Sequence, residues 1–306
     1  MSREARGITT LQAGAMAMVL VSSFLVAVVP NFSKLAYQSG ASVPLVISGR
    51  FVVIVLLLGV MLVSQRHSFF ASMRVLRLCA IGGIAAAFMS FGVLTAITRI
   101  DLSLVILIFY LHPILIAWFG HVRGTYALNR FRLFCCALIL VGLALALSVS
   151  LARLDAMGVA LAFIGACGAA GLLIANGEAV GEGGTVIVNF YTAIVALVPA
   201  CAIGMVIGPL NFPGTGTGWF GLLGAGVAMC LGLALFFAAM RPIGLVRATM
   251  ITVVEPVFGI LLAIVLFDER LSAVQWFGVV VVVAGLLLLE TPVNAINRLL
   301  RGDPVV

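Results

Sequence analysis

Residues 100–120, IDLSLVILIFYLHPILIAWFG, align without a gap with residues 243–263, IGLVRATMITVVEPVFGILLA. The alignment has an offset of 143 positions and continues beyond this window. A shared proline is informative, because a proline inside an apolar helix frees a backbone carbonyl that then needs another partner. The sequence therefore contains an internal repeat, in which the informative pairs are Gly83 with Gly226, Ala96 with Ala239, Pro113 with Pro256 and Gly142 with Gly285.

The composition places this repeat in a membrane. Of the 306 residues, 64% are hydrophobic and 9% are charged, whereas a soluble domain carries about 25% charged residues. The surplus apolar surface must face lipid. The formal net charge is +7, but the basic residues stand singly at the ends of apolar runs, which argues against a nucleic-acid partner and for membrane orientation.

Apolar runs of about 20 residues predict membrane-spanning helices. We expect ten of them, over residues 12–33, 43–63, 76–98, 102–120, 129–149, 156–176, 185–207, 218–240, 244–266 and 273–290. Residues 1–150 would form the first repeat, and residues 151–306 the second repeat with a short cytoplasmic C-terminal tail. Because each half holds an odd number of spans, the second must enter the membrane from the opposite side. The expected fold class is an all-α membrane protein of ten transmembrane helices in two inverted five-helix repeats.

The distribution of basic residues predicts the orientation, since Lys and Arg concentrate on the cytoplasmic side. With both termini inside, twelve basic residues lie at inner ends of spans, while the outer ends hold Lys34, Arg99, Arg153 and Arg270. We expect a multi-pass protein of the cell (inner) membrane with both termini in the cytoplasm. The predicted inner loop over residues 177–184 is an exception, because it is acidic.

The stretch TVVEPVFGILLAIVLFDERLSAVQWFGVVVVVAGLLLL, starting at Thr252, resembles the closing part of EamA-type members of the drug/metabolite transporter superfamily. The matching positions are Glu255-Pro256-Val257, Glu269, Gln275-Trp276, Gly278 and Gly285. Weaker matches in the first half are Arg50-Phe51, Ala96 and Pro113. This sequence departs from the family in having Ser22-Ser23 for a common Trp-Gly pair, and Tyr126 where the first repeat would match Glu269.

The resemblance implies ten helices in two inverted halves that move amino acids, metabolites, nucleotide sugars or drugs, often by export. The repeat independently favours a secondary transporter, because two similar halves can exchange inward-open and outward-open states around a central site. We expect alternating access and, as substrate, an exported amino acid or related zwitterion. Import, other metabolites and amphiphilic drugs remain alternatives. Proton coupling and a homodimer are both compatible with the sequence.

Two ionisable residues are predicted near the membrane midplane, where such groups are costly and usually functional. His112 and Glu255 each lie roughly 15–18 Å deep, in a core about 30 Å thick. They are repeat equivalents directly before a proline. The carboxylate would accept a substrate ammonium or a proton. Alternatively, His112 would only bond a carbonyl freed by Pro113 or Pro256.

Four further polar residues are candidates for binding substrate. Arg50, roughly 10 Å below the outer surface, would grip a carboxylate with its bidentate guanidinium, or else snorkel as a structural arginine. Thr252 shares a helix face of small and polar residues with Glu255, which suits a cavity or close helix packing. Asn189 and Asn31 would line the pathway, although intramembrane asparagines more often bridge helices.

Competing classes find less support in the sequence. It has three histidines, no HExxH and no GxSxG, so we expect no enzyme, no metal and no cofactor. A channel would favour charged rings or a repeated filter motif. An interaction subunit would leave the midplane polar residues without a purpose. The expected partners are a small-molecule substrate and the lipid bilayer.

Overall fold

The structure is a computed structural model that describes residues 3–66, 69–149, 154–267 and 271–290. Every regular element in these ranges is a helix, as the composition predicts. The predicted C-terminal tail and Glu269 lie outside the described residues. In chain order the helices are α1 (Arg3–Gln38), α2 (Val43–Ser64), α3 (Met73–Ile97), α4 (Leu102–Phe109), α5 (His112–Val122), α6 (Arg130–Ala146), α7 (Ala156–Gly183), α8 (Thr185–Ile207), α9 (Gly216–Ile243), α10 (Leu245–Ile251), a 3-10 turn (Thr252–Val254), α11 (Glu255–Phe267) and α12 (Ala273–Glu290).

The helices are long and apolar enough to make this a multi-pass membrane protein. Within the described residues, eight helical segments qualify as membrane spans, with α4 and α5 counted as one segment and α10 joined to α11 as another. The two remaining predicted spans are shorter: α6 has 17 residues, and α12 is a short apolar helix. The presence of ten membrane spans therefore stays a prediction.

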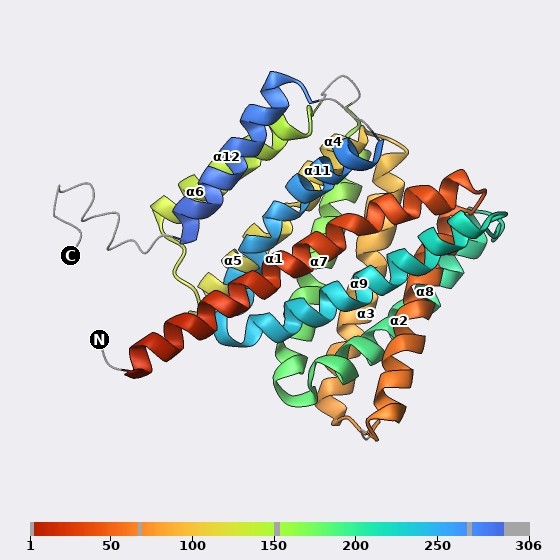
Figure 1. Ribbon diagram of the computed structural model, residues 1–306, viewed down its shortest axis with the longest axis horizontal. Helices are drawn as coiled ribbons and strands as arrows, with labels where there is room; N and C mark the ends of the chain where they lie inside the picture. The colour runs from red at the N-terminus through yellow and green to blue at the C-terminus, as the bar shows by residue number, and fades with distance from the viewer. Residues whose placement is uncertain (1–2, 67–68, 150–153, 268–270, 291–306) are drawn as a thin grey trace.

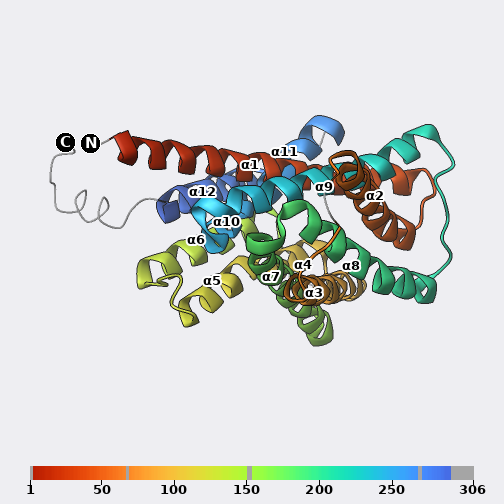
Figure 2. The same ribbon diagram turned by 90° about the horizontal axis from the view of Figure 1, so that it is seen from below.

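The helices pack mainly across the two halves of the chain. The long helix α1 lies along α9, and α3 lies along α7. Figure 2 shows α1 on one side of the molecule and α3 with α7 on the other. The pairs α2 with α8 and α6 with α12 each join a helix of the first half to one of the second. The core thus forms between the halves, and neither half buries its helices alone.

Small residues allow these helix pairs to approach closely. A Cβ atom on Gly168 of α7 would lie 2.5 Å from the backbone nitrogen of Met89 on α3. A Cβ atom on Gly221 of α9 would lie 2.5 Å from the carbonyl oxygen of Phe32 on α1. Lipid tails are as apolar as leucine, so helices in a membrane associate through such close packing.

Two tight turns depend on glycine. Gly184 (φ +76°) joins α7 to α8, and Gly244 (φ +83°) joins α9 to α10. This left-handed backbone carries little penalty only for glycine. The predicted loop over residues 177–184 is wrong, because α7 continues to Gly183. Its two glutamates face basic residues near other helix ends, since Glu178 pairs with Arg123 and Glu182 lies 3.7 Å from Arg74.

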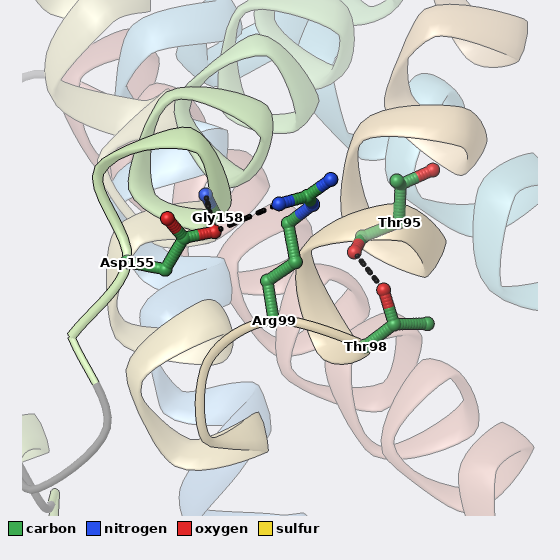
Figure 3. Close-up of polar contacts among 5 residues, drawn as sticks. All are labelled: Thr95, Thr98, Arg99, Asp155 and Gly158. Carbon is green, nitrogen blue, oxygen red and sulfur yellow. Dashed lines mark hydrogen bonds and ion pairs between the residues drawn. The ribbon is translucent and has the colours of Figure 1, made fainter.

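An ion pair joins the end of α3 to the start of α7, at the face predicted to be outside. Arg99 Nη1 donates to Asp155 Oδ2 over 3.2 Å, and the same oxygen accepts the N–H of Gly158, so that Asp155 caps α7 (Figure 3). The Arg99 hydrogen bond and the capping N–H groups hold the pKa of Asp155 below its usual range. The contact joins the two helices at this face.

We expect Gly278→Ala to destabilise the protein, because its Cβ would lie 2.3 Å from the backbone nitrogen of Ala146 on α6. Overpacking of this kind costs about 1–3 kcal/mol. Chemical unfolding in detergent measures the loss. The matched control is Gly181→Ala on α7, where a Cβ meets nothing within 4 Å. Equal stability of the two variants would contradict the close contact of α6 with α12.

We expect Asp155→Asn to flatten the acid branch of the stability profile. The folded-state pKa of Asp155 lies below the unfolded value of about 3.9. Its contribution is therefore complete above that value and is lost as the pH falls through the folded-state pKa. Thermal midpoints between neutral pH and pH about 3 check this, and parallel profiles for both proteins would refute it.

Candidate substrate-binding site

The fourth and ninth predicted spans are each broken in the middle. Helix α4 ends at Phe109 and α5 begins at His112, while a 3-10 turn separates α10 from α11. The breaks fall just before Pro113 and Pro256, at equivalent positions of the repeat. Proline has no N–H, so the carbonyl four residues earlier loses its helical partner. In a membrane that carbonyl needs a donor from the protein.

In the first half, the side chain of His112 supplies this donor. Pro113 leaves the carbonyl of Phe109 free, and His112 Nδ1 lies 2.9 Å from that oxygen. Because a carbonyl only accepts, Nδ1 carries the proton. The imidazole is 6% exposed and lies against the rings of Phe109 and Tyr110. The structure therefore places His112 in the helix break and not in contact with Glu255.

In the second half, a backbone N–H supplies the donor for the freed carbonyl. Pro256 leaves the carbonyl of Thr252 free, and the N–H of Glu255 donates to it within the 3-10 turn. The Glu255 side chain is therefore not needed at the break. The hydroxyl of Tyr110, from the other half of the chain, lies close enough to interact with its carboxyl, and Glu255 lines a cavity.

This central cavity has a volume of about 610 Å³. Helices α1, α2, α3, α4, α6, α11 and α12 contribute to its walls. Most lining residues are apolar, among them Met89, Val93, Leu94 and Phe109. The polar groups are few and come from different helices: Asn31, Arg50, Ser90, Tyr110, Glu255 and Gln275. Apolar walls with a small number of polar groups are typical of a site for a small molecule.

Among the described residues that line the central cavity, Arg50 is the only basic one. It is half-buried, and its electrostatic neighbour is the Tyr37 phenol on α1. Among the described residues, no carboxylate forms an ion pair with it. A guanidinium in hydrocarbon needs compensating polar groups, and here it opens onto a cavity that also holds Glu255. The cavity thus contains one basic and one acidic side chain that are not paired with each other.

The other three predicted residues differ in position. Asn31 lines the central cavity, with its Nδ2 donating to the Ala27 carbonyl at 3.2 Å. Thr252 is not a lining residue, and its hydroxyl donates to the Thr249 carbonyl at 2.8 Å. Asn189 lies in a separate small pocket. The structure therefore brings together Arg50, Glu255 and Asn31 out of the six candidates.

Sequence reasoning missed Tyr110 and Gln275. The signal for Tyr110 was available, since it is a polar aromatic residue beside the predicted midplane proline. Its partner is 145 positions away in the chain, Glu255. Gln275 was noted only as part of a family-like pair. Its Nε2 reaches the Ala146 carbonyl on α6 at 3.5 Å, so it also borders the cavity from α12.

A second cavity, of about 730 Å³, lies at the other end of the broken helices. The ends of α5, α7 and α9 and the start of α10 line it. Arg123 and Glu178, which form an ion pair, both line it, and Arg241 Nη2 donates to the Val180 carbonyl at 2.7 Å. These contacts tie the helix ends together at this face.

Helices of this length and composition define a polytopic membrane protein. Residues 156–291 match the EamA-like transporter family, which is part of the drug/metabolite transporter superfamily. The predicted resemblance is thereby confirmed.

The fold also has solved relatives. Of the solved structures, 29 chains match. One of them, titled only "Crystal structure of protein", is 16% identical, with a TM-score of 0.77 over 94% of this chain and 99% of that chain. At this identity the likeness shows the fold alone. No curated protein sequence matches the chain.

We expect His112→Leu to lower stability and to leave ligand binding in the cavity unchanged. The variant leaves the buried Phe109 carbonyl without its donor, which costs about 1–3 kcal/mol. Unfolding in detergent measures this. His112→Gln, which keeps an N–H donor, is the matched control and should lose less. Loss of ligand binding with unchanged stability would show that His112 faces the ligand.

Proposed function

We propose that this protein is a secondary active transporter that exports amino acids or related zwitterions by alternating access. The observation that carries the proposal is the cavity in which Arg50 from the first half and Glu255 from the second are present without pairing with each other. The EamA-like match supports transport in general. The substrate class comes from the two charges.

The two charges suit the two ends of a zwitterion. A guanidinium binds a carboxylate through two parallel hydrogen bonds, and a carboxylate binds an ammonium group. In this proposal Arg50 holds the substrate carboxylate, and Glu255 accepts its ammonium group or, between transport steps, a proton. The Tyr110 hydroxyl keeps the carboxyl of Glu255 directed while the site is empty.

The packing of the helices supports an inverted repeat. In the ten-span scheme α1, α2 and α3 correspond to α7, α8 and α9. The contact of α1 with α9 then mirrors that of α3 with α7, while α2 with α8 and α6 with α12 are contacts between equivalents. The two helix breaks also fall at equivalent positions. Such a frame allows two similar states of opposite orientation.

The positions of the two cavities bear on which side of the membrane the binding site opens to. The central cavity reaches Leu102, Leu147 and Leu271, which lie near helix ends that the basic residues predict to be outside. The second cavity lies at the ends predicted to be inside, where the pair of Arg123 with Glu178 joins α5 to α7. We therefore propose an outward-facing arrangement, and the inward-facing one would require this pair to separate.

A second candidate substrate class is an amphiphilic cation. The largely apolar walls, with Met89 and Phe109 among them, would hold its hydrophobic part, and Glu255 would bind the cation. For this class Arg50 would be unfavourable, because it repels a cation. The response of transport to Arg50 therefore separates the two classes.

We expect purified protein in proteoliposomes to move at least one radiolabelled amino acid. Arg50→Ala and Glu255→Gln should each lower the initial rate by about tenfold or more, since each removes a charged hydrogen bond of about 1.5–3 kcal/mol. Arg50→Lys should retain part of it. The control is Arg99→Ala, outside the cavity, with folding checked by thermal unfolding.

Absence of flux for all amino acids would count against the proposal. A rise in transport of an amphiphilic cation in Arg50→Ala would favour the second class. Unchanged amino-acid flux in both cavity variants would return Arg50 and Glu255 to structural roles.

A further inference from the structure

A small pocket of about 40 Å³ lies between α2, α3, α7, α8 and α9, apart from the central cavity. Its polar lining residues are Asn176 on α7 and Asn189 and Thr192 on α8. All three are buried, with exposed fractions of 1%, 5% and 6%. The rest of the lining is apolar apart from the thiol of Cys230.

The hydrogen bonds of this pocket are incomplete. The Thr192 hydroxyl donates to Asn176 Oδ1 at 2.9 Å. Within the part of the chain that the structure describes, Asn189 Nδ2 has no hydrogen-bond partner. Buried polar groups are nearly always paired, and each exception calls for an explanation. Asn189 lines a pocket that is large enough for a water molecule, so an acceptor bound there would complete its hydrogen bonds.

The packing of the helices does not require these polar residues. In the first half, the repeat-equivalent residues of Asn176, Asn189 and Thr192 are Ser33, Val46 and Gly49. There, Val46 and Leu222 belong to one apolar cluster, and Leu222 Cδ1 lies 3.0 Å from where a Cβ on Gly49 would be. At the positions of Asn189 and Thr192 the first half therefore has no polar side chain, while Ser33 donates to the Val29 carbonyl of its own helix.

Met89 connects the pocket to the central cavity, because it lines both. Its backbone is held against α7, where a Cβ on Gly168 would lie 2.5 Å from the Met89 nitrogen. The side chain is flexible, as methionine has three rotatable bonds. A change of its rotamer would therefore join the two spaces without moving α3.

The pocket lies toward the end of the bundle opposite to the mouth of the central cavity. Asn176 and Asn189 are seven and four residues from the ends of α7 and α8 that meet at Gly184, roughly 6–11 Å along the helices. The mouth of the cavity lies near the start of α12. A solute that passes Met89 would therefore advance toward the opposite face.

We propose that Asn176, Asn189 and Thr192 form a second binding station on the translocation path, gated by Met89, for a hydrogen-bond-accepting oxygen. Two sources share this chemistry, the carboxylate of a transported zwitterion and a water molecule. The inference rests on the proposed transport function, which supplies the path. The amide of Asn189 donates to the acceptor, and the paired Asn176 and Thr192 fix the shape of the site.

Cys230 allows a test that needs no known substrate, because its thiol lines the pocket. The other five cysteines are replaced by alanine, namely Cys79, Cys135, Cys136, Cys167 and Cys201. The probe is the small anionic reagent 2-sulfonatoethyl methanethiosulfonate, applied to the full chain in proteoliposomes. The matched control keeps only Cys135, a fully buried thiol that lines neither space.

We expect Cys230 to react faster than Cys135, by about tenfold or more, since thiol reactivity follows access to water. Met89→Ala should accelerate the reaction further, and Asn189→Leu should slow it by filling the pocket. Reaction at the rate of Cys135, with or without Met89, would overturn the proposal. If these variants fold poorly, Ala193→Cys in a Cys230→Ala background places a second thiol in the same lining.

Saturating amino acid identifies the source of the oxygen. Slower labelling in its presence assigns the acceptor to a substrate carboxylate, and unchanged labelling of a reactive Cys230 assigns it to water. The outcomes also separate the two proposals. Transport without labelling refutes only the second station, whereas labelling without transport of any amino acid refutes only the proposed function.

Discussion

Two prolines in the middle of membrane helices impose the constraint on which the site depends. Each removes an N–H and leaves a carbonyl that lipid cannot satisfy. The first half uses the imidazole of His112 for this carbonyl, and the second uses the N–H of Glu255 in a 3-10 turn. Since the carbonyl in the second half is satisfied by a backbone N–H, the carboxyl of Glu255 is not needed there and remains available to the cavity. The same position of the repeat therefore serves the helix break in one half and lines the cavity in the other.

The charged residues of the protein likewise fall into two groups, those that form ion pairs at helix ends and those that line the cavity. At the helix ends, Arg99 pairs with Asp155, and Arg123 pairs with Glu178. These pairs hold neighbouring helices at the two faces of the bundle. In the cavity, Arg50 and Glu255 have neutral phenols as neighbours, Tyr37 and Tyr110. Unpaired charges within a membrane are costly, and a polar ligand would offset that cost.

The two halves share a frame but not their chemistry. Gly83 on α3 and Gly226 on α9 are repeat equivalents, and a Cβ on either would lie 2.6 Å from the Cβ of a valine on the opposite half, Val195 or Val53. Close packing thus maintains the similarity, because any added atom would separate the helices. At the positions of Asn189 and Thr192, by contrast, the first half has Val46 and Gly49.

The sequence by itself determined that the chain is a multi-pass helical membrane protein related to the EamA-like family. The hydrophobic composition indicates that the protein lies in a membrane, and the apolar runs predict its helices. The motif around Glu255 indicates the family. It also placed Arg50 and Glu255 as buried charges. Only the tertiary structure decided that both face one cavity, that Tyr110 is the partner of Glu255 and that His112 serves the helix break. The reason is that each of these roles depends on which groups lie close to the side chain in the folded protein. A sequence pattern identifies candidate residues but does not show their neighbours in space.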